Sequence, residues 1–264
     1  EGARSLVASC VYPVNEGMVV RTTTSVVREA RKIVVELLLA NHPPDCLACA
    51  RNLNCELQTI AGDLGIRKIR FDGERKNYPI DASNPSLVHD QSKCILCGRC
   101  VRVCSDRQGM HVYSFANRGF KTTVVPAFNQ GLHEVACTFC GQCAAVCPTA
   151  AITIKDDTSL VWKALGDPSK HVVVQTAPAV RVALGEALGL PAGQAVTGKM
   201  VAALRHLGFD RVFDTNFTAD LTIMEEGYEF LHRLQNGGKL PMITSCSPGW
   251  VNFAELTYPD LLDH

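Results

Sequence analysis

Cysteine is the residue type whose number and spacing carry the clearest chemical signal in this sequence. The chain has 13 cysteines among 264 residues; eleven fall in three short segments, and Cys10 and Cys246 stand alone. The odd number excludes a fully paired set of intrachain disulfides, and nothing in the sequence indicates secretion, where disulfides are common. Closely spaced thiolates are, in contrast, typical ligands of protein-bound iron and zinc.

Two of the three segments repeat one pattern, C-x2-C-x2-C-x3-C, 43 residues apart, and the second ends in Cys147-Pro148. This is the spacing of bacterial ferredoxins with two [4Fe–4S] clusters, where the fourth cysteine of a run binds the other cluster. We expect that fourth cysteine at the start of the following helix. Gly98 and Gly141 follow the second cysteine of each run, where a tight loop favours glycine. The pattern predicts two ligand sets, namely Cys94, Cys97, Cys100 and Cys147, and Cys137, Cys140, Cys143 and Cys104.

Zinc is the main alternative for these two runs. Zinc sites usually use two separated pairs of ligands, whereas each run here places four thiolates within eleven residues. We therefore favour two clusters.

The third segment has the pattern H-x3-C-x2-C-x5-C, formed by His42, Cys46, Cys49 and Cys55. Three thiolates and one imidazole complete four ligands, and a neutral imidazole in place of a thiolate makes a cluster less negative. We predict a third [4Fe–4S] cluster here. Zinc on the same four residues is the alternative.

These ligands need helices and strands to position them. Residues 24–40 predict an amphipathic helix ahead of His42, with an apolar stripe of Val26, Val27, Ala30, Ile33, Val34, Leu37 and Leu38. Later segments at 172–175, 200–206, 211–213, 219–234 and 242–243, with a helix opening at 178–181, alternate strand and helix and predict α/β layers. Turn-forming residues near 156–168, where the cysteine-rich part has ended, predict a domain boundary.

The composition of the chain limits the classes of partner that it is expected to bind. The 26 Lys and Arg balance the 26 Asp and Glu, so no charge signal points to nucleic acid. No apolar run is long enough for a membrane span, and no signal peptide opens the chain, so we expect a cytoplasmic protein. Neither a Rossmann glycine fingerprint nor a P-loop is found, so nucleotide binding is expected on a partner. His89 and the remaining histidines have no neighbouring ligand types and are expected to be ordinary core or surface residues.

The order of these segments resembles a known family. A site of one histidine and three cysteines, followed by a two-cluster module, is similar to the accessory region of [FeFe] hydrogenases. It is also similar to the large iron–sulfur subunit of respiratory complex I and to some NAD-linked formate dehydrogenases. In this family a plant-type [2Fe–2S] domain comes first, and residues 1–10 resemble its tail, with Cys10 as its last ligand. A buried free cysteine is the alternative for Cys10.

Two loops in the second half favour the hydrogenases among these relatives. Residues 176–181, TAPAVR, resemble the loop that lines the cavity of the family's active-site cofactor, and residues 244–250, TSCSPGW, resemble its first cluster-binding loop. Molybdenum-dependent formate dehydrogenases would carry a further cysteine-rich loop soon after the ferredoxin module, and this sequence has none.

The resemblance implies reversible reduction of protons to H2 at the H-cluster, a [4Fe–4S] cube joined through a cysteine to a di-iron unit. It implies that Cys246, Glu226 and Glu229 relay protons, and that Pro178, Ala179 and Ser247 lie at the cofactor. Glu226 and Glu229 are three residues apart on a predicted helix and so share a face. A solvated acidic face is the alternative for the two glutamates.

Two departures from the family pattern affect this expectation. The family usually has a cysteine where this chain has Ser247, and a hydroxyl is a poorer iron ligand than a thiolate. The family's two further cluster-binding loops would follow residue 264. We therefore expect a chain cut at both ends, in which Cys10 and Cys246 belong to sites completed elsewhere.

We predict a mixed α+β and α/β chain with four regions: 1–22, the tail of a plant-type [2Fe–2S] domain; 23–66, a helix and the one-His/three-Cys segment; 67–160, a ferredoxin domain with two [4Fe–4S] clusters; and 161–264, the first part of an H-cluster domain. The predicted function is the electron relay and partial active-site domain of an [FeFe] hydrogenase. Electrons would be exchanged with NAD(P)H or ferredoxin through flavin-bearing iron–sulfur subunits. A non-catalytic electron-transfer subunit related to the complex I module is the alternative, and a zinc-bearing interaction scaffold is a third class.

Overall fold

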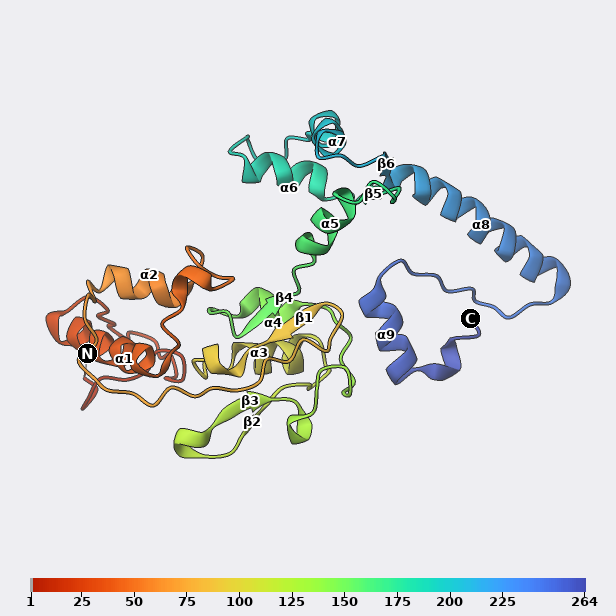
Figure 1. The fold of residues 1–264 in the computed structure, drawn as a ribbon. Coiled ribbons are helices and arrows are strands. Elements are labelled where there is room, and N and C mark those ends of the chain that lie inside the picture. Colours follow the sequence, from red (N-terminus) through yellow and green to blue (C-terminus); the bar gives the residue numbers. More distant parts are fainter. Residues whose placement is uncertain (1) are drawn as a thin grey trace. The chain divides into compact units, whose positions relative to one another are not determined.

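The computed structural model describes residues 2–264 (Figure 1). Glu1, the first residue of the segment compared with the plant-type domain, lies outside the described residues. The chain divides into two compact units, Glu1–Lys155 and Asp156–His264, and each is described by itself. Both contain helices and short strands, so the chain has a mixed fold.

The first helix confirms the prediction for residues 24–40. Helix α1 (Ser25–Asn41) begins where the hydroxyl of Thr24 accepts a hydrogen bond from the backbone N–H of Val27 at 3.3 Å. It ends at His42, whose backbone N–H donates to the carbonyls of Leu38 and Leu39. The cap and the two prolines that follow stop the helix at the first residue of the predicted ligand set.

The predicted apolar stripe of this helix is wrong for most of its members. Val26 and Val34 are 65% and 56% exposed, while Val35 and Glu36 are buried. The physical reason is that α1 packs against α2 (Glu56–Asp63), which draws in the face that carries Val35. Apolar residues occur around much of α1, so their spacing alone did not select the buried face.

The ferredoxin-like module is built from two antiparallel strand pairs and two short helices. Strand β1 (Leu87–His89) pairs with β4 (Ile152–Ile154), and β2 (Ser114–Ala116) pairs with β3 (Thr123–Val125). Helix α3 (Arg99–Arg102), which continues as a π-helical turn over Val103–Arg107, packs against α4 (Gln142–Val146). A single core joins these elements, and cysteines of both runs lie in it.

The loop glycines behave as predicted, but the fourth cysteines do not. Gly98 and Gly141 precede α3 and α4 with φ of 70° and 75°, a conformation that favours glycine. The fourth cysteine was expected at the start of a helix. Instead the third cysteine lies in the helix, and the fourth follows it: Cys104 in the π-helical turn and Cys147 at the end of α4. Each helix begins one residue before the third cysteine, so the fourth cysteine, four positions later, lies about one helical turn further along the chain.

The second unit alternates helix and strand. It contains α5 (Thr158–Leu165), β5 (Val173–Thr176), α6 (Val180–Ala187), α7 (Thr197–His206), β6 (Arg211–Asp214), α8 (Thr215–Asn236) and α9 (Pro248–Thr257). Strands β5 and β6 are parallel, as expected for α/β connections. The strand predicted at 242–243 is wrong: the backbone N–H of Ile243 donates instead to the carbonyl of His264 at 2.7 Å.

No helix within residues 2–264 combines the length and apolarity needed to cross a bilayer.

Candidate metal centres

The first predicted ligand set surrounds one small cavity. Cys94, Cys97, Cys100 and Cys147 all line it, together with apolar neighbours such as Val124. Cys147 comes from the second cysteine run, so this cavity brings together cysteines of both runs.

The second predicted set surrounds another small cavity. Cys137, Cys140 and Cys143 line it, and Cys104 reaches it from the first run. Four thiols on apolar walls are the donor set and the setting that a [4Fe–4S] cluster requires, so both cavities fit the group.

Burial controls the protonation of these thiols. It raises the pKa of Cys94 to about 11 and those of Cys100 and Cys143 to about 12, and the neighbouring cysteines add to the shift. These three thiols are therefore protonated at neutral pH when they bind nothing. Ligation would have to displace these protons, which couples cluster binding to pH.

Backbone N–H groups are directed at some of the sulfur atoms. Leu96 donates to Sγ of Cys94 at 3.4 Å, and Val112 donates to Sγ of Cys104 at 3.3 Å. Hydrogen bonds to ligand sulfur stabilise negative charge and raise the reduction potential of a cluster.

Two of the predicted ligands of the one-His/three-Cys segment, Cys55 and His42, lie in different surroundings. Cys55 is buried in a second core with Val35, whereas His42 lines a different cavity that also includes Cys94 and Lys76. Burial lowers the pKa of His42, so its imidazole is neutral, the form that binds metal. Within residues 2–264, no three His, Cys, Asp or Glu side chains converge as the ligands of a single metal ion.

This segment is joined to the first cavity through backbone carbonyls. The guanidinium of Arg51 donates to the carbonyl of Cys147 at 2.6 Å. The carbonyl of Pro148 accepts from the thiol of Cys55 at 3.7 Å and from the backbone N–H of Glu56 at 3.1 Å. The segment that carries Cys55 therefore lies directly against the ligand loop of the first set.

Two ion pairs complete this junction. Arg99, which lies between Cys97 and Cys100, forms a bidentate pair with Glu56 at 2.6 and 2.9 Å. Lys93 pairs with Asp45, the residue before Cys46, at 3.1 Å. These positioning residues could not be predicted from the sequence, because pairs more than 40 positions apart leave no mark in local spacing.

Cys10 is exposed, and residues 2–22 form neither helix nor strand. Its role as a [2Fe–2S] ligand stays a prediction.

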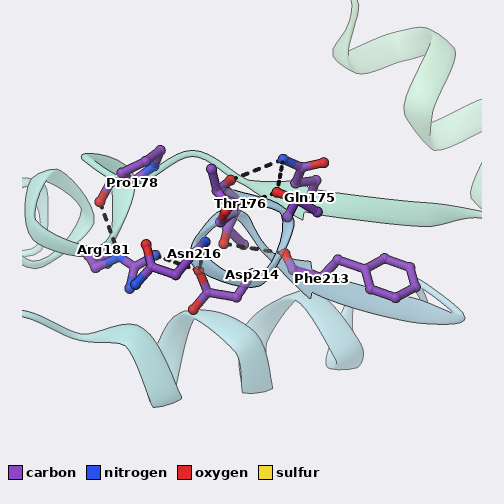
Figure 2. Close-up of polar contacts among 9 residues, drawn as sticks. Gln175, Thr176, Pro178, Arg181, Phe213, Asp214 and Asn216 are labelled. Carbon is purple, nitrogen blue, oxygen red and sulfur yellow. Dashed lines mark hydrogen bonds and ion pairs between the residues drawn. The ribbon is translucent and has the colours of Figure 1, made fainter. Parts of the chain in front are cut away.

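In the second unit, the carboxyl ends of β5 and β6 meet at the loop over residues 176–181 (Figure 2). Arg181 donates to Asp214 at 2.8 Å and to the carbonyl of Pro178 at 3.1 Å, which ties the loop to the end of β6. The hydroxyl of Thr215 donates to the carbonyl of Thr176. Pro178 and Ala179 are exposed in the turn between β5 and α6. Ligand sites of α/β folds lie at such strand ends.

The remaining predicted active-site residues do not contact one another through hydrogen bonds or ion pairs among the residues that the structure describes. Cys246 is exposed, and in the described part of the chain no hydrogen bond or ion pair joins it to Glu226 or Glu229. Both glutamates lie on α8, as predicted, but Glu229 accepts a bond from Arg233 at 2.7 Å, which lowers its pKa. The hydroxyl of Ser247 accepts from the backbone N–H of Trp250 at 3.4 Å and so caps α9. Because Cys246 is the one cysteine of this unit, the unit does not by itself provide the thiolates of an H-cluster.

The family models that match this chain fall separately within its two units. Residues 31–70 match the NADH-ubiquinone oxidoreductase-G iron-sulfur binding region, residues 93–151 match a 4Fe-4S dicluster domain, and residues 170–264 match the iron only hydrogenase large subunit, C-terminal domain. The chain thus combines iron–sulfur electron-transfer domains with a hydrogenase domain.

Individual relatives narrow the class further. The chain is 53% identical over 270 residues to the NADP-reducing hydrogenase subunit HndD of Solidesulfovibrio fructosivorans, covering 100% of this chain and 46% of that protein. It is 40% identical over 260 residues to iron hydrogenase 1 of Clostridium pasteurianum, covering 98% and 45%. A solved NAD+-reducing [NiFe]-hydrogenase is similar with a TM-score of 0.53 and 30% identity, over 56% of this chain and 64% of that chain. Residues 170–264 of this chain therefore carry the iron-only, or [FeFe], hydrogenase large-subunit domain. The chain spans about half the length of the curated relatives it matches.

Proposed function

We propose that this chain is the electron-relay and partial active-site region of an [FeFe] hydrogenase that reversibly reduces protons to H2. The observation that carries the proposal is the pair of cavities, each lined by four cysteines drawn from both runs. The match of residues 170–264 to the hydrogenase large-subunit domain supports the reaction.

Bound [4Fe–4S] clusters would supply one-electron carriers, and the chain's own residues would hold and insulate them. Cys94, Cys97, Cys100 and Cys147 hold the first, and Cys104, Cys137, Cys140 and Cys143 the second. The apolar walls exclude water, and N–H donors such as those of Leu96 and Val112 favour the reduced state.

The contacts of Arg51, Cys55 and Glu56 with Cys147-Pro148 support an order for this relay. A cluster on His42, Cys46, Cys49 and Cys55 would exchange electrons with the first ferredoxin cluster and then the second. Electrons would enter from flavin-bearing, NAD(P)-linked iron–sulfur subunits or from ferredoxin, and Cys10 would belong to a [2Fe–2S] centre on the same side. The relative named an NADP-reducing hydrogenase subunit supports the nucleotide-linked form. A cytoplasmic location, where NAD(P)H is found, is part of the proposal.

At the active site, Cys246, Glu226 and Glu229 would pass protons, while Pro178, Ala179 and Ser247 would border the H-cluster. The single cysteine of this unit does not complete the ligand set of the H-cluster.

Iron and acid-labile sulfide analysis tests the relay. We expect about 12 of each per chain for three cubes. Zinc without sulfide would contradict the proposal. Hydrogen turnover and infrared bands of CO and cyanide in the matured protein test the reaction itself.

A non-catalytic electron-transfer subunit is the second candidate, favoured by the match of residues 31–70 to the complex I region and by the serine at position 247. Full cluster content without hydrogen turnover or infrared bands would support it. Replacing Ser247 by Cys, the residue usual in the family, should then leave activity absent.

A further inference from the structure

The hydroxyl of Tyr113 is a buried polar group without a partner. The residue is 3% exposed, and its oxygen and Oε1 of Glu36 are the two buried side-chain atoms without a hydrogen bond in the part of the chain that the structure describes. Leaving a buried hydroxyl unpaired is unfavourable, and folded proteins pair the large majority of such groups. The surroundings of Tyr113 therefore indicate the partner that it lacks.

Tyr113 lines the second cysteine cavity. Cys104, Cys137, Cys140 and Cys143 line the same cavity. The residue directly before it, Val112, donates its backbone N–H to Sγ of Cys104 at 3.3 Å, which fixes the local backbone to one ligand. A tyrosine hydroxyl is protonated at neutral pH and can therefore donate, and the thiol of Cys143 lies within interaction range of this hydroxyl.

The ring of Tyr113 is held in place by packing. It contacts His89 edge-to-face, with ring centroids 5.4 Å apart and an interplanar angle of 77°. His89 is 2% exposed, as a core histidine should be, and it lines the first cysteine cavity. The His89–Tyr113 pair thus stands between the two cavities, and the core that encloses the ring prevents the hydroxyl from turning to solvent.

We propose that Tyr113 tunes the second cluster by donating its O–H to the thiolate sulfur of Cys143. The inference rests on the proposed function, because it requires the second ligand set to hold a [4Fe–4S] cluster. A hydrogen bond to ligand sulfur stabilises the more negative, reduced cluster and so raises its potential. Tyr113 acts through Cys143 and is a positioning residue, not a catalytic one.

Tyr113→Phe removes the hydroxyl and keeps the ring. In the reconstituted full chain, followed by EPR during a redox titration, the ratio of reduced to oxidised forms of one cluster at fixed potential should fall about tenfold. That change corresponds to about 59 mV for a one-electron couple. The other clusters should not shift. Tyr228→Phe, at a tyrosine that is 74% exposed in the second unit, is the matched control and should leave all potentials unchanged.

Iron and sulfide content separates this inference from the proposed function. A wild-type chain that takes up no clusters would overturn both. A Tyr113→Phe chain with full cluster content and unchanged potentials would overturn the role of Tyr113 alone. If Tyr113→Phe loads poorly, 3-fluorotyrosine at position 113 keeps the hydroxyl and makes it a stronger donor. A raised potential would then support the hydrogen bond, and an unchanged one would overturn it.

Discussion

The two units of the chain differ most in what their chemically important residues are packed against. In Glu1–Lys155, cysteines of both runs belong to one hydrophobic core, and each cavity is closed by residues of that unit. In Asp156–His264, helix α8 has no buried residue, and Cys246 is exposed. The first unit therefore shapes its sites by its own packing, whereas the predicted proton-relay residues of the second unit, Cys246, Glu226 and Glu229, are not buried.

The largest expected effect follows from this contrast. Cys143→Ser should remove one of three clusters, so iron content should fall by about four atoms per chain. It should also destabilise the core, since Cys143 is buried there. Cys246→Ser should leave the iron of the three relay clusters unchanged. Equal losses of iron in both variants would contradict the distinction between the two units.

A smaller effect is expected where the one-His/three-Cys segment meets the ferredoxin module. Arg51→Met removes the donor to the carbonyl of Cys147, a contact of 2.6 Å in a half-buried position. Hydrogen bonds from charged groups contribute about 1.5–3 kcal/mol, and partial exposure should reduce this to about 1–2 kcal/mol in the free energy of unfolding. Denaturant titration measures the change, with Arg31→Met on the exposed side of α1 as the control. Equal midpoints for the two variants would show that the junction is weak.

The same contrast explains how far the sequence predicts this molecule. The grouping of the cysteines around two cavities could be predicted from their spacing, because a short loop restricts where three nearby side chains can lie. The packed face of α1 did not follow, because α2 decides it. The bond from Arg51 to Cys147 joins residues 96 positions apart, and Tyr113 carries no spacing signal at all. In the second unit, the sequence alone does not tell whether the hydroxyl of Ser247 replaces a cysteine ligand or caps a helix. The structure shows the helix cap.

That ambiguity at Ser247 can be resolved by substitution. Ser247→Ala removes the cap on α9 and should cost about 1 kcal/mol of stability, while Ser247→Asp should retain the cap. Neither variant should change iron content if the hydroxyl is only a cap. Loss of iron in the alanine variant would instead identify Ser247 as a ligand. Thermal unfolding with parallel iron analysis makes the measurement.

The smallest effect concerns acid sensitivity at the loop of Figure 2. The backbone N–H of Asn216, and then Arg181, lower the pKa of Asp214. A carboxyl with a lowered folded-state pKa stabilises the fold above its unfolded pKa of about 3.9, and this contribution is lost as pH falls through the folded value. Wild-type stability should therefore drop more steeply below about pH 4 than that of Asp214→Asn, in which the titrating group is gone. Asp220→Asn, on the exposed surface of α8, should keep the wild-type slope. If Asp214→Asn also kept that slope in acid unfolding curves, the Arg181–Asp214 contact would not hold the 176–181 loop in solution.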